Sequence, residues 1–158
     1  MLRSGKQDGT INVIDGVETV KEKAFAESGV QKIIFPASLK NIEKEMFLNC
    51  KNLKKIQISS SNSYMTVVDG AIYSKNKGKL LSAGVAKGTF KLLKKTIKIQ
   101  RCAFAGNETV KKVVITGRMK KLEKEGFAYS GICNIELPET LHIVGKGAFR
   151  ECKNLKKV

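Results

Sequence analysis

The sequence predicts an α/β solenoid, in which short repeats wind into a right-handed superhelix with a parallel β-sheet on one face and short helical turns on the other. Two observations carry this prediction. A short apolar phrase returns along the chain with a period in the low twenties, and a stretch at about residues 59–88 interrupts it. A fixed period of roughly 20–50 residues is the signature of repeat architectures. With 158 residues, 42% of them hydrophobic, the chain has enough material for one folded domain.

Each repeat is centred on a phenylalanine. Phe25 and Phe47 are 22 residues apart, and the same distance separates Phe127 from Phe149. Phe104 lies 23 residues before Phe127, whereas 57 residues separate it from Phe47, which is one repeat plus an insertion. A single unit of this size cannot cover its own apolar face, so it is stable only when stacked on neighbours. We therefore expect the five phenylalanines to form one continuous file along a single elongated core.

A strand is expected after each phenylalanine turn, because apolar residues two positions apart point to the same face of a strand. Together with an apolar residue at the bend, these residues form an inward-facing set in each complete repeat. The sets are Val30, Ile33 and Phe35; Leu53, Ile56 and Ile58; Val110, Val113 and Ile115; and Ile132, Ile135 and Leu137. Stacked repeats would pair these strands in parallel.

The residues between the inward positions face outward. Those just before the central apolar position are Lys32, Lys55, Lys112, Asn134 and Lys157, and those just after it are Ile34, Gln57, Val114 and Glu136. Stacking brings the lysines into a row that the repeat with the insertion interrupts. Like charges in this row repel, and an acidic partner would relieve the repulsion. The alternative is a solvated row of charges that binds nothing. Since exposed solenoid sheets commonly bind partners, we predict a partner-binding face formed by Lys32, Lys55, Gln57, Lys112, Glu136 and Lys157.

The interrupting segment has the pattern of a β-hairpin. Asp69-Gly70 is a turn signal, and residues 71–74 and 79–81 resemble short strands joined through a Lys-Asn-Lys-Gly turn. We expect this hairpin to stand off the solenoid.

The domain organisation follows from these boundaries. We expect a polar, linker-like or tag-like segment at residues 1–9 and one repeat domain at residues 10–158, with the hairpin inserted at about 59–88. Because the last repeat phrase is cut short at Leu155-Lys-Lys-Val158, we expect the chain to be a fragment of a longer protein.

These phrases resemble the BspA-like leucine-rich repeat family. The resemblance rests on the AFxxCxxLKxI phrase, on the insertion from Asn62 to Leu81 with its Asp-Gly hairpin, and on the GTFxL…TIKIQRCAF return, and it covers about residues 10–158. It implies a cell-surface or secreted protein of bacteria or protozoa that mediates adhesion to protein or host surfaces. The chain departs from the family pattern in its many lysines and in lacking a Thr-Ile-Pro strand start at Thr10 and Phe90.

The sequence offers little material for catalysis or metal binding. His142 is the single histidine, and because lysines fill its repeat position elsewhere we expect it at the surface. The four cysteines form no C-x-x-C pair, so neither a metal site nor a cofactor is expected. Cys50 and Cys152 both follow a repeat phenylalanine by three residues, and we expect them to be small interior groups without a disulfide. The chain is predicted to be non-enzymatic.

The composition points to acidic partners. The formal net charge is +16, and only four of the 30 basic residues are arginines. Nucleic acid is not the expected partner, because base reading favours arginine and base stacking needs aromatic side chains. No apolar run reaches the roughly 18–20 residues of a membrane helix, so no membrane insertion is expected. We expect a monomer that binds a protein or an acidic host or cell-surface ligand.

Two alternative functions remain open at this point. Four unpaired thiols favour an intracellular protein-interaction scaffold, since secreted proteins usually pair their cysteines. The net charge favours a polyanion binder, whose ligand would be a glycosaminoglycan, a cell-wall polymer or a nucleic acid held by the lysine-rich face.

Overall fold

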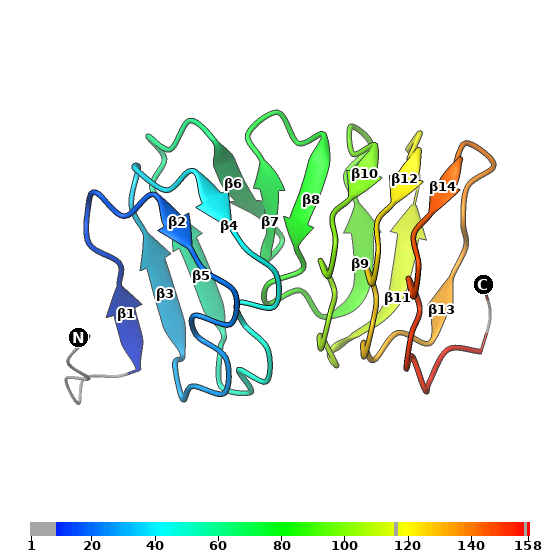
Figure 1. The fold of residues 1–158 in the computed structure, drawn as a ribbon, viewed down its shortest axis with the longest axis horizontal. Coiled ribbons are helices and arrows are strands. Elements are labelled where there is room, and N and C mark those ends of the chain that lie inside the picture. Colours follow the sequence, from blue (N-terminus) through cyan, green and yellow to red (C-terminus); the bar gives the residue numbers. More distant parts are fainter. Residues whose placement is uncertain (1–8, 116, 157) are drawn as a thin grey trace.

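Short strands form the regular secondary structure of this chain. The computed structural model describes residues 9–115, 117–156 and 158, so Lys157 of the predicted binding face lies outside the described residues. These residues contain 14 strands and no helix. The strands lie in two layers that the chain visits alternately, and the first and last strands lie at opposite ends of an elongated molecule (Figure 1). The predicted parallel-strand solenoid is confirmed.

We call one of the two layers the front layer, and it contains the strand that follows each phenylalanine turn. One parallel sheet has the order β1 (Thr10–Asn12), β3 (Lys32–Phe35) and β5 (Lys55–Ile58). A second parallel sheet has the order β9 (Gly88–Leu92), β11 (Val110–Ile115) and β13 (Asn134–Ile135). Each strand therefore pairs with a strand about one repeat away along the chain.

The back layer carries a shorter strand from each repeat. β2 (Thr19–Val20) pairs in parallel with β4 (Asn41–Ile42). β8 (Lys79–Ser82), β10 (Lys98–Ile99), β12 (Lys121–Leu122) and β14 (Ile143–Val144) follow one another in a larger sheet.

The segments around the repeat phenylalanines are successive hydrogen-bonded turns, although we expected short helical turns. In every repeat the residues two positions before and two positions after the phenylalanine have φ between 54° and 68°: Lys23 and Glu27, Glu45 and Asn49, Cys102 and Gly106, Glu125 and Tyr129, Gly147 and Glu151. A residue in the left-handed region cannot continue a right-handed helix. The helical part of the predicted α/β class is therefore not found in the described residues, and the right-handed sense of the superhelix stays a prediction.

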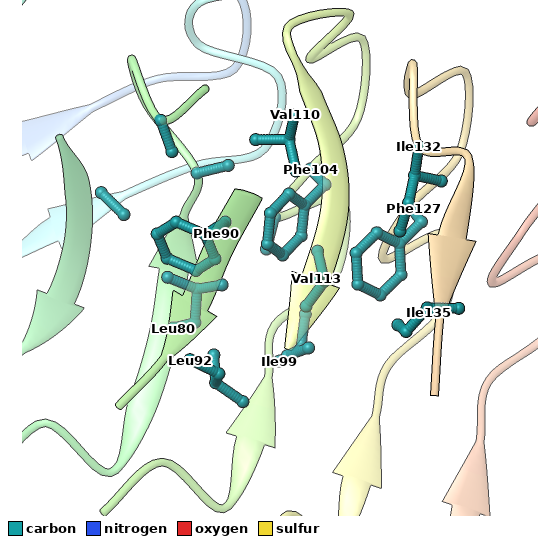
Figure 2. Close-up of a cluster of buried hydrophobic side chains, with 14 of the residues drawn as sticks. Leu80, Phe90, Leu92, Ile99, Phe104, Val110, Val113, Phe127, Ile132 and Ile135 are labelled. Atoms are coloured by element: carbon teal, nitrogen blue, oxygen red, sulfur yellow. The ribbon is translucent and has the colours of Figure 1, made fainter. Parts of the chain in front are cut away.

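The inward-facing strand positions are confirmed. Ile33, Val113 and Ile135 are at most 1% exposed, whereas Ile58 and Ile115 at the strand ends are partly buried. Figure 2 shows the side chains of Phe90, Phe104 and Phe127 among the apolar residues of the surrounding strands. The period-2 alternation of the front strands thus supplies one wall of the core and the phenylalanine turns supply another.

The phenylalanines form two files, so the prediction of one continuous file along a single core is wrong. The ring of Phe25 stacks on Phe47 with 6.1 Å between centroids. Phe104, Phe127 and Phe149 form a second stack with centroid distances of 4.4 and 5.4 Å. The buried apolar residues accordingly fall into a first core, between Val20 and Ile72, and a second core, between Ala71 and Ala148.

The inserted hairpin is confirmed, because antiparallel strands are present where residues 71–74 and 79–81 predicted them, and its strands belong to the back layer. β6 (Met65–Val68) and β7 (Ala71–Ser74) are antiparallel, and β7 is antiparallel to β8, which continues the sheet to β10. Asp69 and Gly70 join β6 to β7 with φ of 50° and 77°, as a two-residue type I′ hairpin turn requires.

The hairpin does not stand off the solenoid, as we had expected, but forms a wall between the two cores. Ile72 packs in the first core with Met65, whereas Ala71 and Tyr73 pack in the second core with Leu80. All three β7 residues are at most 1% exposed. A strand covered on both faces carries a continuous apolar run instead of an alternating one, and Ala-Ile-Tyr is such a run.

One phenylalanine turn is missing beside this wall. Residues 100–109 connect β10 to β11 and contain Phe104, whereas only residues 83–87, without a phenylalanine, connect β8 to β9. The front layer is also divided there, because β5 and β9 belong to different sheets. The long gap between Phe47 and Phe104 in the sequence therefore corresponds to a physical break in the stack.

Candidate functional site

Three residues of the predicted binding face lie together in the first front sheet. Lys32 of β3 is in register with Lys55 of β5, and Gln57 lies opposite Ile34. Both lysines face outward, since Ile33 and Ile56 beside them are buried. Strands in a sheet are about 4.8 Å apart, and neither lysine forms an ion pair within the described residues. The pair is an uncompensated patch of positive charge.

Two other predicted residues lie in the second front sheet. Lys112 of β11 is flanked by Thr89 of β9 and Asn134 of β13, and Glu136 follows β13 directly. A shallow depression of about 200 Å³ is lined by Lys112, Asn134, Glu136 and their strand neighbours. Lys55 and Lys112 belong to separate sheets, so the row of lysines is interrupted at the insertion, as predicted. The structure holds a lysine pair and a separate lysine beside a shallow depression.

A second lysine row, on the back layer, was missed by the sequence analysis. Lys79, Lys98 and Lys121 are in register on β8, β10 and β12. Glu123 lies against this row, with Oε1 2.7 Å from Lys98 Nζ and 3.4 Å from Lys121 Nζ. The signal was a lysine directly before the buried residue in each of these three strands. The glutamate compensates this row, unlike the front-face lysines.

The environment of Glu123 favours its charged form. Burial by itself would raise the pKa of this carboxyl, but the hydrogen bond from Lys98, the backbone N–H of Arg101 and the contact with Lys121 outweigh burial and lower the pKa. Glu123 is therefore a structural counter-ion of the back layer.

A groove lies where the phenylalanine turn is missing. Its volume is about 520 Å³, within the roughly 300–1,000 Å³ of common ligand pockets. The turn around Phe47 forms one wall, the turn around Phe104 forms the other, and residues 81–87 line the space between them. The sequence analysis did not find this groove, although the 57-residue phenylalanine spacing was its signal.

The cysteines serve the packing of the phenylalanine turns. Cys50 Sγ donates to the backbone oxygen of Phe25 at 2.8 Å, and Cys152 Sγ makes the equivalent bond to Phe127 at 2.9 Å. All four cysteines are free, as predicted for Cys50 and Cys152. Burial, with help from nearby Glu45 and Glu125, raises the pKa of the Cys102 thiol.

The described residues contain no grouping of three or more metal-ligating side chains. His142 is exposed on the segment before β14, as predicted, and its backbone N–H donates to the Lys120 oxygen. No helix in the described part of the chain has the length and apolar character needed to cross a membrane.

Stacked parallel strands, a period in the low twenties and a phenylalanine turn that recurs in five repeats define a leucine-rich-repeat solenoid. The chain belongs to the family of BspA type leucine-rich repeat regions. The family model matches residues 7–77 and 86–158 with six copies, which confirms the resemblance found in the sequence.

Solved structures of bacterial proteins share the fold. A leucine-rich repeat protein from Eubacterium ventriosum has a TM-score of 0.83 and 23% identity over 93% of this chain and 40% of its own. The pneumococcal vaccine antigen PcpA has a TM-score of 0.73 and 21% sequence identity, and the match covers 93% of this chain and 44% of PcpA. A leucine-rich cell surface protein from Faecalibacterium prausnitzii has a TM-score of 0.75 and 17% sequence identity, and the match covers 94% of this chain and 46% of that protein.

The chain thus spans less than half the length of each of these three structures. The comparison with curated proteins gave no match.

Proposed function

We propose that this chain is a non-enzymatic protein-binding module that acts in adhesion, within a cell-surface or secreted protein. Membership of the BspA type family supports a binding role. One structural neighbour is described as a cell surface protein and another as a vaccine antigen, which supports an exposed location. The proposed partner is a protein or an acidic host or cell-surface ligand, bound by a monomer.

The observation that carries this proposal is the difference between the two lysine-bearing faces. On the back layer Glu123 compensates Lys98 and Lys121. On the front layer Lys32 and Lys55 are adjacent and form no ion pair within the described residues. Like charges opposite one another in a sheet are unfavourable, so a carboxylate from a partner gains most at the front face.

A comparison of two triple variants tests the front face. Lys32→Glu, Lys55→Glu and Lys112→Glu together reverse the charge of three of its lysines. The control, Lys94→Glu, Lys95→Glu and Lys120→Glu, makes the same charge change at exposed residues off the front sheets. Binding to a panel of purified extracellular-matrix glycoproteins is measured by surface plasmon resonance at about 0.15 M salt, where the Debye length is about 8 Å.

We expect the front-face variant to lose at least about tenfold in affinity, which corresponds to about 1.4 kcal/mol, while the control changes little. Equal losses in both variants would mean that net charge alone drives binding. No binding of the unmodified chain to any glycoprotein of the panel would count against adhesion.

The net charge of +16 supports a second candidate, a polyanion binder. Binding through phosphates or sulfates releases counterions, so it weakens steeply with salt. Elution from a heparin column only at high salt would favour this candidate, and passage through the column at physiological salt would contradict it.

A further inference from the structure

The groove interrupts a ladder of backbone hydrogen bonds between successive phenylalanine turns. In the first stack the N–H groups of Phe25 and Glu27 donate to the oxygens of Met46 and Leu48, at 3.0 and 2.8 Å. The turns around Phe104 and Phe127 form the same pattern. In each, the backbone N–H groups of the phenylalanine and of the residue two positions later donate to backbone oxygens of the following turn. Each of these turns is therefore tied to the next by at least two parallel bonds.

The turn around Phe47 has the same donors and no following turn. Within the described residues, no bond is formed by the N–H groups of Phe47 and Asn49. Across the groove the oxygen of Ala105 is likewise unused, although its equivalents Leu48 and Ala128 each accept a bond. Two donors and one acceptor at ladder spacing thus line the place of the missing turn.

The walls of the groove also leave an aromatic surface open. Phe47 stacks on Phe25 on one side only and is half-buried, whereas Phe104 is covered by Phe90 at 5.6 Å and is 1% exposed. The side chain of Leu48 reaches toward the opposite wall, since a Cβ added to Gly106 would lie 2.6 Å from Leu48 Cδ1. The rest of the space, about 520 Å³, remains free.

The charges around the groove are unbalanced. Three of the charged residues that line it, Glu43, Lys44 and Glu45, are ion-paired to neighbours in the preceding repeat. The exposed residues Lys51, Lys54 and Lys87 form no ion pair in the described part of the chain, and neither does Glu108. Three free lysines against one free glutamate favour an occupant with negative charge.

We propose that this groove binds an acidic peptide segment of a partner protein that carries a phenylalanine. Two carbonyl oxygens of the peptide, two residues apart, accept hydrogen bonds from Phe47 and Asn49, and one peptide N–H donates to Ala105. The peptide ring lies against the open side of Phe47, and its carboxylates face Lys51, Lys54 and Lys87. The peptide takes the place of the missing turn, by the backbone pairing that strand addition uses at a sheet edge.

A blocked peptide, Glu-Glu-Gly-Phe-Ala-Tyr-Ser-Glu, is a suitable probe. It carries the sequence of residues 126–130, whose backbone oxygens receive this pair of bonds from the Phe104 turn. Titration into the ¹⁵N-labelled chain, followed by ¹H–¹⁵N correlation spectra, is expected to give saturable shifts of the Phe47 and Asn49 amides. Replacing the peptide phenylalanine by alanine, or its glutamates by lysines, should weaken binding at least about tenfold each.

The last turn provides an internal control, because the N–H groups of Phe149 and Glu151 are also without partners among the described residues and have no opposite wall. Saturable shifts of equal affinity at Phe149 and Glu151 would overturn the proposal, since the peptide would then recognise any open turn edge, and shifts at this last turn alone would overturn it too. The absence of saturable shifts would overturn it as well.

Two variants of the chain complete the test. Ala105→Glu places bulk and negative charge on the groove wall at a position where the equivalent residues are Leu48 and Arg150, so the fold should tolerate it. It and the triple variant Lys51→Glu, Lys54→Glu and Lys87→Glu should each weaken peptide binding at least about tenfold. The front-face triple variant should bind the peptide normally, so failure here is distinguishable from failure of the adhesion proposal. Undiminished binding by Ala105→Glu would contradict the proposal.

Discussion

Ile72 and Tyr73 are consecutive residues of β7, yet their side chains lie in different hydrophobic cores. Alternation along the strand sends Ile72 toward the stack of Phe25 and Phe47 and Tyr73 toward the stack that begins at Phe104. The antiparallel hairpin thus serves as a wall for two short solenoid stacks, and both stacks depend on it. This arrangement also accounts for the missing phenylalanine turn beside the wall.

Truncation of either residue should destabilise the whole chain. Each of Ile72→Ala and Tyr73→Ala is expected to lower the free energy of unfolding by about 2–5 kcal/mol, because each opens a cavity in a buried site. Urea denaturation measures the loss, and exposed Lys79→Ala on β8 is the control. NMR chemical shifts should distinguish the two variants. Ile72→Ala should change the shifts of residues around Ile56, and Tyr73→Ala should change those of residues around Ile99. A loss below about 1 kcal/mol would mean that the hairpin packs loosely.

Asn62 fastens the insertion to the preceding repeat. Asn62 is 1% exposed. Its Nδ2 donates hydrogen bonds to the oxygen of Leu39, at 2.7 Å, and to two nearby backbone carbonyls. Its Oδ1 accepts hydrogen bonds from the N–H groups of residues 64 and 65, both at 2.8 Å. Asn62→Ala should cost about 1–3 kcal/mol of stability, since buried carbonyls lose their donor.

Asn62→Asp should show a distinctive pH dependence. A carboxylate facing the Leu39 carbonyl is disfavoured, so the pKa of the new carboxyl should rise on folding. The penalty then grows as pH rises above the unfolded value of about 3.9, and urea titrations should find the variant closest to the unmodified chain near pH 4. A penalty that is independent of pH would show that the site is solvated.

Glu123 should stabilise the fold above acidic pH. Because its pKa is lowered in the folded state, its contribution is present above the unfolded value of about 4.3 and is lost as pH falls through the folded pKa. Glu123→Gln should therefore cost up to about 1 kcal/mol at pH 7 and progressively less below about pH 4. Urea unfolding of the variant and of the unmodified chain, at pH 7 and below about pH 4, measures the cost of Glu123→Gln. The control is the same substitution at the exposed Glu139. An equal cost at both pH values would rule out the charge as its cause.

The slot of Cys50 should accept a hydroxyl more readily than an apolar group. Cys50 Sγ donates to the Phe25 oxygen at 2.8 Å, and Ser28 fills the equivalent slot of the preceding repeat. Cys50→Ser should change stability by less than about 0.5 kcal/mol, whereas Cys50→Val should cost about 1–3 kcal/mol because the carbonyl loses its donor. Thermal denaturation of both variants checks the order, and a more stable valine variant would contradict it.

The inward strand positions could be predicted because local alternation determines them. Ile33, Val113 and Ile135 each follow an outward polar residue, and burial of one face then sets the strand register. The left-handed residues of the phenylalanine turns had no comparable signal. Of the ten, only Gly106 and Gly147 are glycines, so the sequence did not reveal that the turns are not helical.

The missed features depend on contacts across the insertion. The consecutive apolar residues Ala71, Ile72 and Tyr73 are typical of a strand buried on both faces, a signal that our expectation of a protruding hairpin did not use. The separation of Lys55 from Lys112, by contrast, was expected at the insertion, where the hairpin wall replaces a strand pairing that the period predicts. The groove follows from that replacement as well.

Native-state amide hydrogen exchange at Ile72 and Tyr73 tests the central claim most directly, namely that β7 is a wall shared by both cores. If β7 is such a wall, the amides of Ile72 and Tyr73 exchange only when the chain unfolds globally, and their exchange free energies equal those of Ile33 and Val113. Exchange at the faster rate of a locally opening hairpin, while the amides of β3 and β11 stay protected, would contradict it.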